Sequence, residues 1–412
     1  MPEEVKGGNK GIFEGLTVLA FGWAVVGPLT MKYLADYGAT VIRVETAERT
    51  CTLRTSPPYK GEKAGLNNSG YFNHLNSNIL SFSLNMSHPE ALAIAKRLIS
   101  KSDVFMENLA PGIIERWGLD YDEVKKVKHD IIMLRQSGFG SYGPYSRMPA
   151  FGMILTSLTG IPNSIGWPDR EPLPVGVAAY TDYIAPRFAT AALIAALDYR
   201  RKTGKGQLLD VSQMESAIQF IIPSILDNIS NDREPSRRGN SNPSASPHGV
   251  FPCKGNDRWC TIAVTNKEEW QNLCLVIGDN EYLNDPGFDS FINRKKYEDN
   301  IYTEISKWTA TQRAEEVMLR LQTAGVPSGV VKNSKDLYSD PQLRHRGLFW
   351  PLEHSEMGLF THLGSSFVLS KTPARAERPS PRLGEHTEQV CTKILGMSDD
   401  EFVELIHAGV LE

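Results

Sequence analysis

The sequence has little of what marks secreted, membrane-spanning or nucleic-acid-binding proteins. It holds five cysteines in 412 residues and no CxxC pair, which excludes a disulfide framework and favours reduced, buried thiols. No apolar run reaches the ~18 residues of a membrane span, and the acidic start lacks the pattern of a secretory signal. With 44 basic and 48 acidic residues, the net charge of −4 gives no field for nucleic acid or anionic lipid. We therefore expect a cytoplasmic protein with no nucleic-acid or membrane partner.

Several chemical signatures are also missing. The nine histidines are dispersed, and neither HExxH nor a His/Cys cluster occurs, so no metal site is expected. The first strand-to-helix turn, Gly22–Gly27, reads GWAVVG and lacks the GxGxxG of dinucleotide-binding proteins. No GxxxxGK[ST] and no GxSxG occur, which argues against P-loop and α/β-hydrolase chemistry.

The N-terminal half contains short apolar runs that alternate with stretches of helical periodicity. This β-α-β order predicts an α/β fold with a mostly parallel sheet covered by helices. The predicted strands are Leu16–Phe21, Thr40–Val44, Ile79–Leu84, Asp103–Met106 and Ile131–Leu134.

The composition changes near Asn228. The run Ser230–Pro247 is rich in Ser, Asn and Pro and predicts a linker. A smaller α/β pattern follows, then extended chain over Gly347–Leu369. Ser398–Leu411 predicts a helix whose Phe402, Leu405 and Ile406 face a core. We divide the chain into the N-terminal part of a large domain, a small domain with its linker, and a C-terminal return to the large domain, at residues 1–228, 229–340 and 341–412.

Asp182 is the strongest candidate for chemistry. It precedes an apolar, Ala-rich helix predicted over Asp182–Tyr199 and follows the Gly- and Ala-containing stretch Val175–Thr181. The simplest interpretation is a helix N-cap, where the macrodipole favours a carboxylate. A functional carboxylate here would be ionised and partly shielded from water, which suits a nucleophile.

Five segments together resemble the class III CoA-transferase family, which includes formyl-CoA, carnitine and benzylsuccinate CoA-transferases and the 2-methylacyl-CoA racemases. The third segment contains an RxxTGxGQ element that begins at Arg200. The segments are Leu16–Glu45, Asp103–Leu119, Asp182–Glu215, Gly325–Gly347 and Pro381–Leu395.

The resemblance implies a fold and a mechanism. The large domain would be Rossmann-like, with a parallel sheet built from both chain ends, and a smaller α/β domain would be inserted. Two chains would interlock as rings. Asp182 would attack an acyl-CoA thioester and pass through an aspartyl anhydride and an aspartyl–CoA thioester. Coenzyme A would be bound as a substrate thioester, with no tightly held cofactor.

The resemblance also assigns CoA contacts to Val26, Asn108, Leu109 and Arg116, and an arginine fork suits a CoA phosphate. Ser137 and Gly138 follow a predicted strand end and are expected to line the same cleft.

Departures from the family pattern reduce the range of substrates that the resemblance implies. Val25 stands where many members have Gln, and Ile79 where many have Lys. Asn240–His248 replaces a poly-Gly loop, and Gly152 replaces a Glu of the formyl-CoA branch; these changes weaken an oxalate or formate assignment. The absence of His around Pro149–Gly152 argues against racemisation.

Three short elements resemble the branch that acts on aromatic or 2-substituted acids, and indicate a benzylsuccinate CoA-transferase that uses succinyl-CoA. They are Ala185–Arg187, Ser212–Gln213 and Pro247–Cys253. Two alternatives stay open: a racemase or epimerase on the same scaffold, and a silent CoA-binding subunit of a hetero-oligomer. The expected partner is a second copy of the chain or a homologous subunit.

Overall fold

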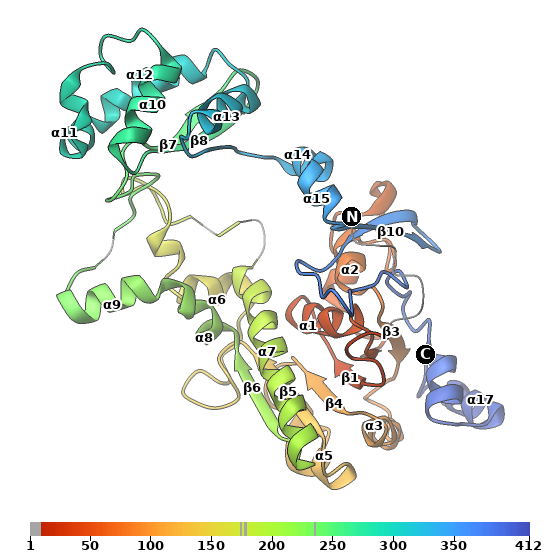
Figure 1. Cartoon of the computed structure of the whole chain (residues 1–412). Coiled ribbons are helices and arrows are strands. Elements are labelled where there is room, and N and C mark those ends of the chain that lie inside the picture. Colours follow the sequence, from red (N-terminus) through yellow and green to blue (C-terminus); the bar gives the residue numbers. More distant parts are fainter. Residues whose placement is uncertain (1–9, 174, 177–178, 235) are drawn as a thin grey trace. The chain divides into compact units, whose positions relative to one another are not determined.

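The computed structural model describes residues 10–173, 175–176, 179–234 and 236–412, which belong to two compact units (Figure 1). The larger unit comprises residues 1–161, 174–230 and 342–412, and the smaller unit comprises 162–173 and 231–341. The larger unit is therefore discontinuous in sequence, since the smaller unit separates its last segment from the rest.

A six-stranded parallel sheet forms the centre of the larger unit, in the order β3-β2-β1-β4-β5-β6. The strands are β1 (Thr17–Phe21), β2 (Thr40–Glu45), β3 (Leu80–Ser83), β4 (Val104–Glu107), β5 (Ile132–Ser137) and β6 (Leu208–Ser212). The predicted parallel sheet is confirmed. The expectation that both chain ends supply it is wrong, because every strand comes from the first 212 residues. The C-terminal segment supplies helices and apolar side chains instead.

Helices cover both faces of this sheet. On one face α1 and α7 pack together, with Met31 and Leu34 of α1 and Leu193 of α7 in the same core as strands β1, β4 and β5. On the other face α3 and α5 share a core with the C-terminal residues Val390 and Leu411. Figure 1 shows α7 alongside β5 and β6. The helices of this unit are α1 (Val26–Ala35), α2 (Gly70–Leu75), α3 (Ala91–Ser100), α4 (Ile113–Arg116), α5 (Tyr121–Val127), α6 (Gly152–Leu158), α7 (Tyr180–Thr203), α8 (Gln213–Ile218), α9 (Ile222–Asn231), α16 (Thr387–Gln389) and α17 (Asp399–His407).

The C-terminal segment confirms most of its predicted elements. Ser398 caps α17 through a hydrogen bond from Glu401 N–H to its hydroxyl, and Phe402 and Leu405 pack against the core. The prediction that Ile406 faces the core is wrong, because this residue is 39% exposed. Each residue of a helix is rotated by about 100° from the one before it, so Ile406 points away from the side on which Leu405 packs. The predicted extended stretch is a hairpin of β10 (Phe349–His354) and β11 (Gly358–Leu363).

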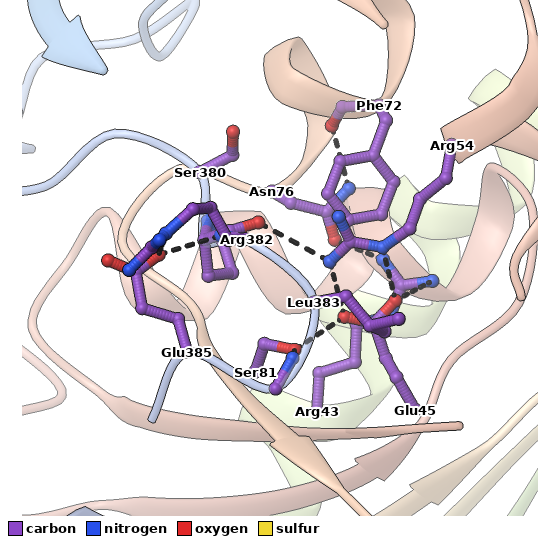
Figure 2. A network of polar contacts seen from close by, with 12 residues as sticks. Arg43, Glu45, Arg54, Phe72, Asn76, Ser81, Ser380, Arg382, Leu383 and Glu385 are labelled. Carbon is purple, nitrogen blue, oxygen red and sulfur yellow. Dashed lines mark hydrogen bonds and ion pairs between the residues drawn. The ribbon is translucent and has the colours of Figure 1, made fainter. Parts of the chain in front are cut away.

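A buried ion-pair network fastens the C-terminal segment to the end of β2 (Figure 2). Both oxygens of Glu45 accept hydrogen bonds from Arg54, at 2.9 and 2.7 Å, and Ser81 donates a third at 2.7 Å. Arg54 also lies 3.7 Å from the centre of the Phe72 ring and donates to the carbonyl of Pro381 at 3.3 Å. Burial alone would raise the pKa of Glu45, but the charges of its arginine neighbours outweigh burial and hold it at about 2.

The smaller unit has an antiparallel sheet of β7 (His248–Pro252), β8 (Trp259–Ala263) and β9 (Ser328–Val330). Its core is formed with α10 (Lys267–Ile277), α12 (Glu298–Thr309) and α13 (Ala314–Thr323). The shorter helices are α11 (Phe291–Lys296) and α14 (Ser334–Ser339), and α15 (Pro341–His345) begins at the last residue of this unit. Among the described residues, no helix is both long and apolar enough to cross a bilayer.

Candidate active site

The sheet has its topological switch point between β1 and β4, the central neighbours from which chain order runs outward in both directions. In open α/β sheets, ligands bind outside the carboxyl ends of the strands at this point. The turn that follows β1 and the residue that follows β4 are joined there. Asn108 accepts a hydrogen bond from Trp23 N–H at 2.6 Å and donates one to the Trp23 carbonyl at 2.9 Å. The side chain of Asn108 therefore shapes the first turn, with one hydrogen bond from its amide nitrogen and one to its amide oxygen.

The other residues predicted to contact CoA lie around these strand ends. Val26 is buried at the start of α1, and Leu109 N–H donates to Glu107 at 2.8 Å. Arg116 is exposed at the end of α4, without an ion pair to any described residue.

Two further predicted residues end β5. The hydroxyl of Ser137 is buried and has no hydrogen-bond partner among the described residues. The carbonyl of Gly138 accepts from Met214 N–H at 3.0 Å, which ties this strand end to α8. A buried hydroxyl without a protein partner is available to a ligand or an ordered water.

Asp182 lies in the first turn of α7, the helix that packs against α1. The residue that caps this helix is Ala179, so the interpretation of Asp182 as an N-cap is wrong; its own N–H donates to the Ala179 carbonyl at 3.1 Å. Its carboxylate is partly buried and has neither a hydrogen bond nor an ion pair with any described residue. Burial raises the pKa of Asp182 to about 6. At pH 7 the carboxylate is still about nine-tenths ionised.

A tyrosine pair stands beside Asp182. The hydroxyls of Tyr71 on α2 and Tyr183 on α7 are 2.9 Å apart. Burial raises the pKa of both, and the negative charge of Asp182 adds to the increase. One hydroxyl donates to the other, so the pair retains one O–H for a third group. Both rings, with Tyr33, pack against a buried apolar cluster that includes Val25 and Phe72.

Gly152, the first residue of α6, closes another side of the carboxylate. A Cβ at this position would lie 2.6 Å from Oδ1 of Asp182 and 2.1 Å from the Cβ of Ala179. The nucleophile candidate thus lies against the backbone of Gly152, and its charge acts on the hydroxyls of Tyr71 and Tyr183.

The acid that ends β2 and the arrangement of possible metal ligands bear on dinucleotide and metal binding. In dinucleotide-binding folds an acidic side chain about twenty residues after the glycine-rich turn receives the ribose hydroxyls. Here the acid that ends β2, Glu45, is fully engaged by Arg54 and Ser81. Within the described ranges, no group of three His, Cys, Asp or Glu side chains is arranged to hold a metal ion.

Comparison with known proteins shows the family. The model of CoA-transferase family III matches residues 13–387. The chain belongs to CoA-transferase family III. A crystal structure of a CAIB/BAIF family protein from Brucella suis superposes with a TM-score of 0.86 at 25% identity, covering 93% of this chain and all of that one.

Curated relatives of this family III chain are similar over nearly its whole length. It is 29% identical to succinyl-CoA:D-citramalate CoA-transferase of Chloroflexus aurantiacus, covering 95% of this chain and 96% of the relative. It is 30% identical to a Mycobacterium tuberculosis protein named as a CoA-transferase, over 97% of this chain; the chain spans half the length of that protein. The family assignment predicted from the sequence is confirmed.

Nothing in the sequence singles out Tyr71 and Tyr183. They lie 112 residues apart in the chain, and only the fold brings them together. Gly152 stands out in the sequence only as a departure from the formyl-CoA branch, because no local pattern signals its contact with Asp182.

Proposed function

We propose that this chain transfers CoA from an acyl-CoA, preferably succinyl-CoA, to a carboxylic acid, with Asp182 as the covalent nucleophile. The observation that carries the proposal is the state of that carboxylate: partly buried, without a hydrogen bond or ion pair to any described residue, and with a pKa raised to about 6. A carboxylate needs no general base because it has no proton to lose, and a raised pKa makes it a stronger nucleophile.

Each step of the proposed reaction conserves charge and acyl-transfer potential. An oxygen of Asp182 forms a bond to the thioester carbon, the C–S bond breaks, and the electron pair leaves with the CoA thiolate. The thiolate then attacks the aspartyl carbonyl of the anhydride, which releases the donor acid and leaves an aspartyl–CoA thioester. The acceptor carboxylate attacks this thioester, and CoA returns to the new acyl group through a second anhydride. Both intermediates hydrolyse readily, so water must be excluded.

The chain's own groups suit these steps. The oxyanion that forms on the attacked carbonyl needs a hydrogen-bond donor. The spare O–H of the Tyr71–Tyr183 pair stands beside Asp182 and is our candidate for that donor. We propose that CoA lies along the carboxyl ends of the central strands, with Val26, Asn108, Leu109, Arg116, Ser137 and Gly138 around it.

The acceptor that we propose is an aryl or 2-substituted acid, with benzylsuccinate as the specific candidate. The apolar cluster that packs with Tyr33, Tyr71 and Tyr183, the last of which follows Asp182 in the chain, supports an acid with an apolar substituent. Citramalate, in the name of the Chloroflexus relative, is a 2-substituted acid without an aryl group, and is therefore the contrasting acceptor that tests benzylsuccinate.

We further propose that the chain works in the cytoplasm as an interlocked dimer, or pairs with a homologous subunit. Exposed apolar side chains at the N-cap of α6 and on α9, among them Phe151 (76%) and Ile229 (74%), support a large protein contact. Free thiols at all five cysteines suit a reducing compartment.

The test uses the purified chain with acyl-CoA and no acceptor acid. CoA should become attached to the peptide that contains Asp182, hydroxylamine should convert that position to a hydroxamate, and Asp182→Ala should abolish both the adduct and turnover. Turnover by Asp182→Ala would exclude the mechanism. Incorporation of α-deuterium from D₂O without an acceptor would identify a racemase, and an inactive, adduct-free chain would identify a silent subunit. A screen of acids read by mass spectrometry then names the acceptor.

A further inference from the structure

Gly152 lies so close to the Asp182 carboxylate that a residue with a side chain would not fit at position 152. A Cβ built on it would lie 2.6 Å from Oδ1 and 2.8 Å from Cγ of Asp182, distances at which one group must move. Gly152 is not among the glycines with positive φ, so its backbone conformation suits any residue. The close approach, and not the backbone geometry, therefore requires glycine at this position.

The backbone of Gly152 is held from two sides. Its carbonyl accepts a hydrogen bond from Thr156 Oγ1 in its own helix at 2.7 Å, and another from Thr181 Oγ1 in α7 at 3.3 Å. Both threonines are buried. Since Thr181 directly precedes Asp182, the second bond fixes the start of α7 against the start of α6. The contact between the glycine and the carboxylate is thus built into the packing of the two helices.

We propose that Gly152 is a positioning residue for the nucleophile: its bare backbone covers Oδ1 of Asp182, excludes water from that side and leaves Oδ2 as the oxygen that attacks the thioester. This inference rests on the proposed function, since it assumes that Asp182 is the nucleophile. A carboxylate that has lost water on one side needs less desolvation when it attacks. A side chain at position 152 would push the carboxylate away from the orientation in which Oδ2 meets the substrate, and a displacement of about 1 Å lowers a rate by up to roughly a hundredfold.

A Cβ at position 152 would contact both Asp182 and Ala179, so a test of the positioning role must separate the effects of these two contacts. Gly152→Ala places the methyl group against Asp182 and also 2.1 Å from the Cβ of Ala179. The double variant Gly152→Ala/Ala179→Gly removes the clash with Ala179, and glycine is accepted at a helix N-cap. It keeps the contact with the carboxylate. Ala179→Gly alone is the first control. Ser157→Ala is the second, because Ser157 is exposed on the same helix and, among the described residues, its hydroxyl hydrogen-bonds the Met153 carbonyl alone.

The measurement is the single-turnover rate of CoA attachment to Asp182 from pH 5 to 8, with acyl-CoA KM and melting temperature for each variant. We expect the double variant to melt like Ala179→Gly and to bind acyl-CoA with a KM within about threefold. Its adduct rate should fall roughly tenfold to a hundredfold. Its acid limb should move to lower pH, because a displaced carboxylate is more hydrated. The controls should keep the rate of the unmodified chain.

The outcomes are distinct. A double variant with the rate and pH profile of Ala179→Gly would show that Gly152 only allows the helices to pack, and would overturn the positioning role. An unmodified chain that forms no adduct would refute the proposed function itself, and the positioning role with it.

Discussion

Asp182 lowers the stability of the protein in the state in which it would act. In an unfolded chain its pKa has the ordinary value of 3.8, and in the folded protein burial raises it to about 6. At 1.36 kcal/mol per pKa unit, folding the ionised carboxylate costs about 3 kcal/mol, or nearer 2 because the group is partly exposed. Asp182→Asn keeps the shape and removes the charge. We therefore expect it to stabilise the protein by about 2–3 kcal/mol at pH 7.5.

The pH dependence of the stabilisation by Asp182→Asn shows whether it comes from removal of the charge or from a change in packing. Between pH 3.8 and about 6 the folded protein holds a proton that the unfolded chain has released, so the penalty grows as the pH rises and is complete above pH 6. The advantage of Asp182→Asn should therefore fall by roughly half at pH 5. Urea unfolding of both proteins at pH 7.5 and pH 5 measures it.

An aspartate on the same helix provides the control. Asp198 pairs with Lys202 and Arg201 at the surface, and these partners lower its pKa. Asp198→Asn should therefore destabilise the protein slightly. If Asp182→Asn destabilised the protein at both pH values, or stabilised it equally at both, desolvation of the carboxylate would not be the source of its raised pKa.

Three further outcomes follow from the contacts. Arg54→Met should lower the free energy of unfolding, measured in urea, by about 3 kcal/mol, because the Glu45 carboxylate stays buried without its ion-pair partner. Arg97→Met removes an exposed ion pair and should lower it by less than about 1 kcal/mol. Asn108→Ala should raise the acyl-CoA KM roughly tenfold in steady-state kinetics by freeing the first turn; an unchanged KM would exclude CoA from that turn. Burial lowers the pKa of His362 to about 3, so this residue should cost about 2 kcal/mol of stability between pH 7 and 5. Over that range His362→Gln should lose about 2 kcal/mol less than the unmodified protein in urea unfolding.

The sequence predicts the local elements of this fold well and its long-range contacts poorly. The strands before residue 137 are short apolar runs and could be read directly, because burial on both faces leaves a plain signal. β6 was not predicted as a strand, because its alternating exposure resembles a surface segment. The hairpin of β10 and β11 also escaped, since its turn is formed by Ser355–Met357 and has no Asn-Gly or Asp-Gly signal.

The candidate site divides in the same way. Asp182 could be found from its place before an Ala-rich helix together with the family resemblance. The Tyr71–Tyr183 pair could not, because a hydrogen bond between residues on different helices leaves no periodicity in the chain. For the same reason the hydrogen bonds between Asn108 and Trp23 could not be predicted from the sequence, and the CoA contact that the resemblance assigns to Asn108 stays a prediction.

The discontinuous larger unit has a consequence for how the protein is made. One face of the sheet is covered partly by side chains from Val390 to Leu411, which are synthesised roughly 200 residues after the last strand. At 5–20 residues per second, the ribosome needs about 10–40 s to supply them. The core of the smaller unit, Phe251–Val326, is complete well before that. We expect the smaller unit to complete its core on the ribosome first. Until the C-terminal segment is synthesised, the six-stranded sheet of the larger unit leaves part of an apolar face exposed, where chaperones can bind.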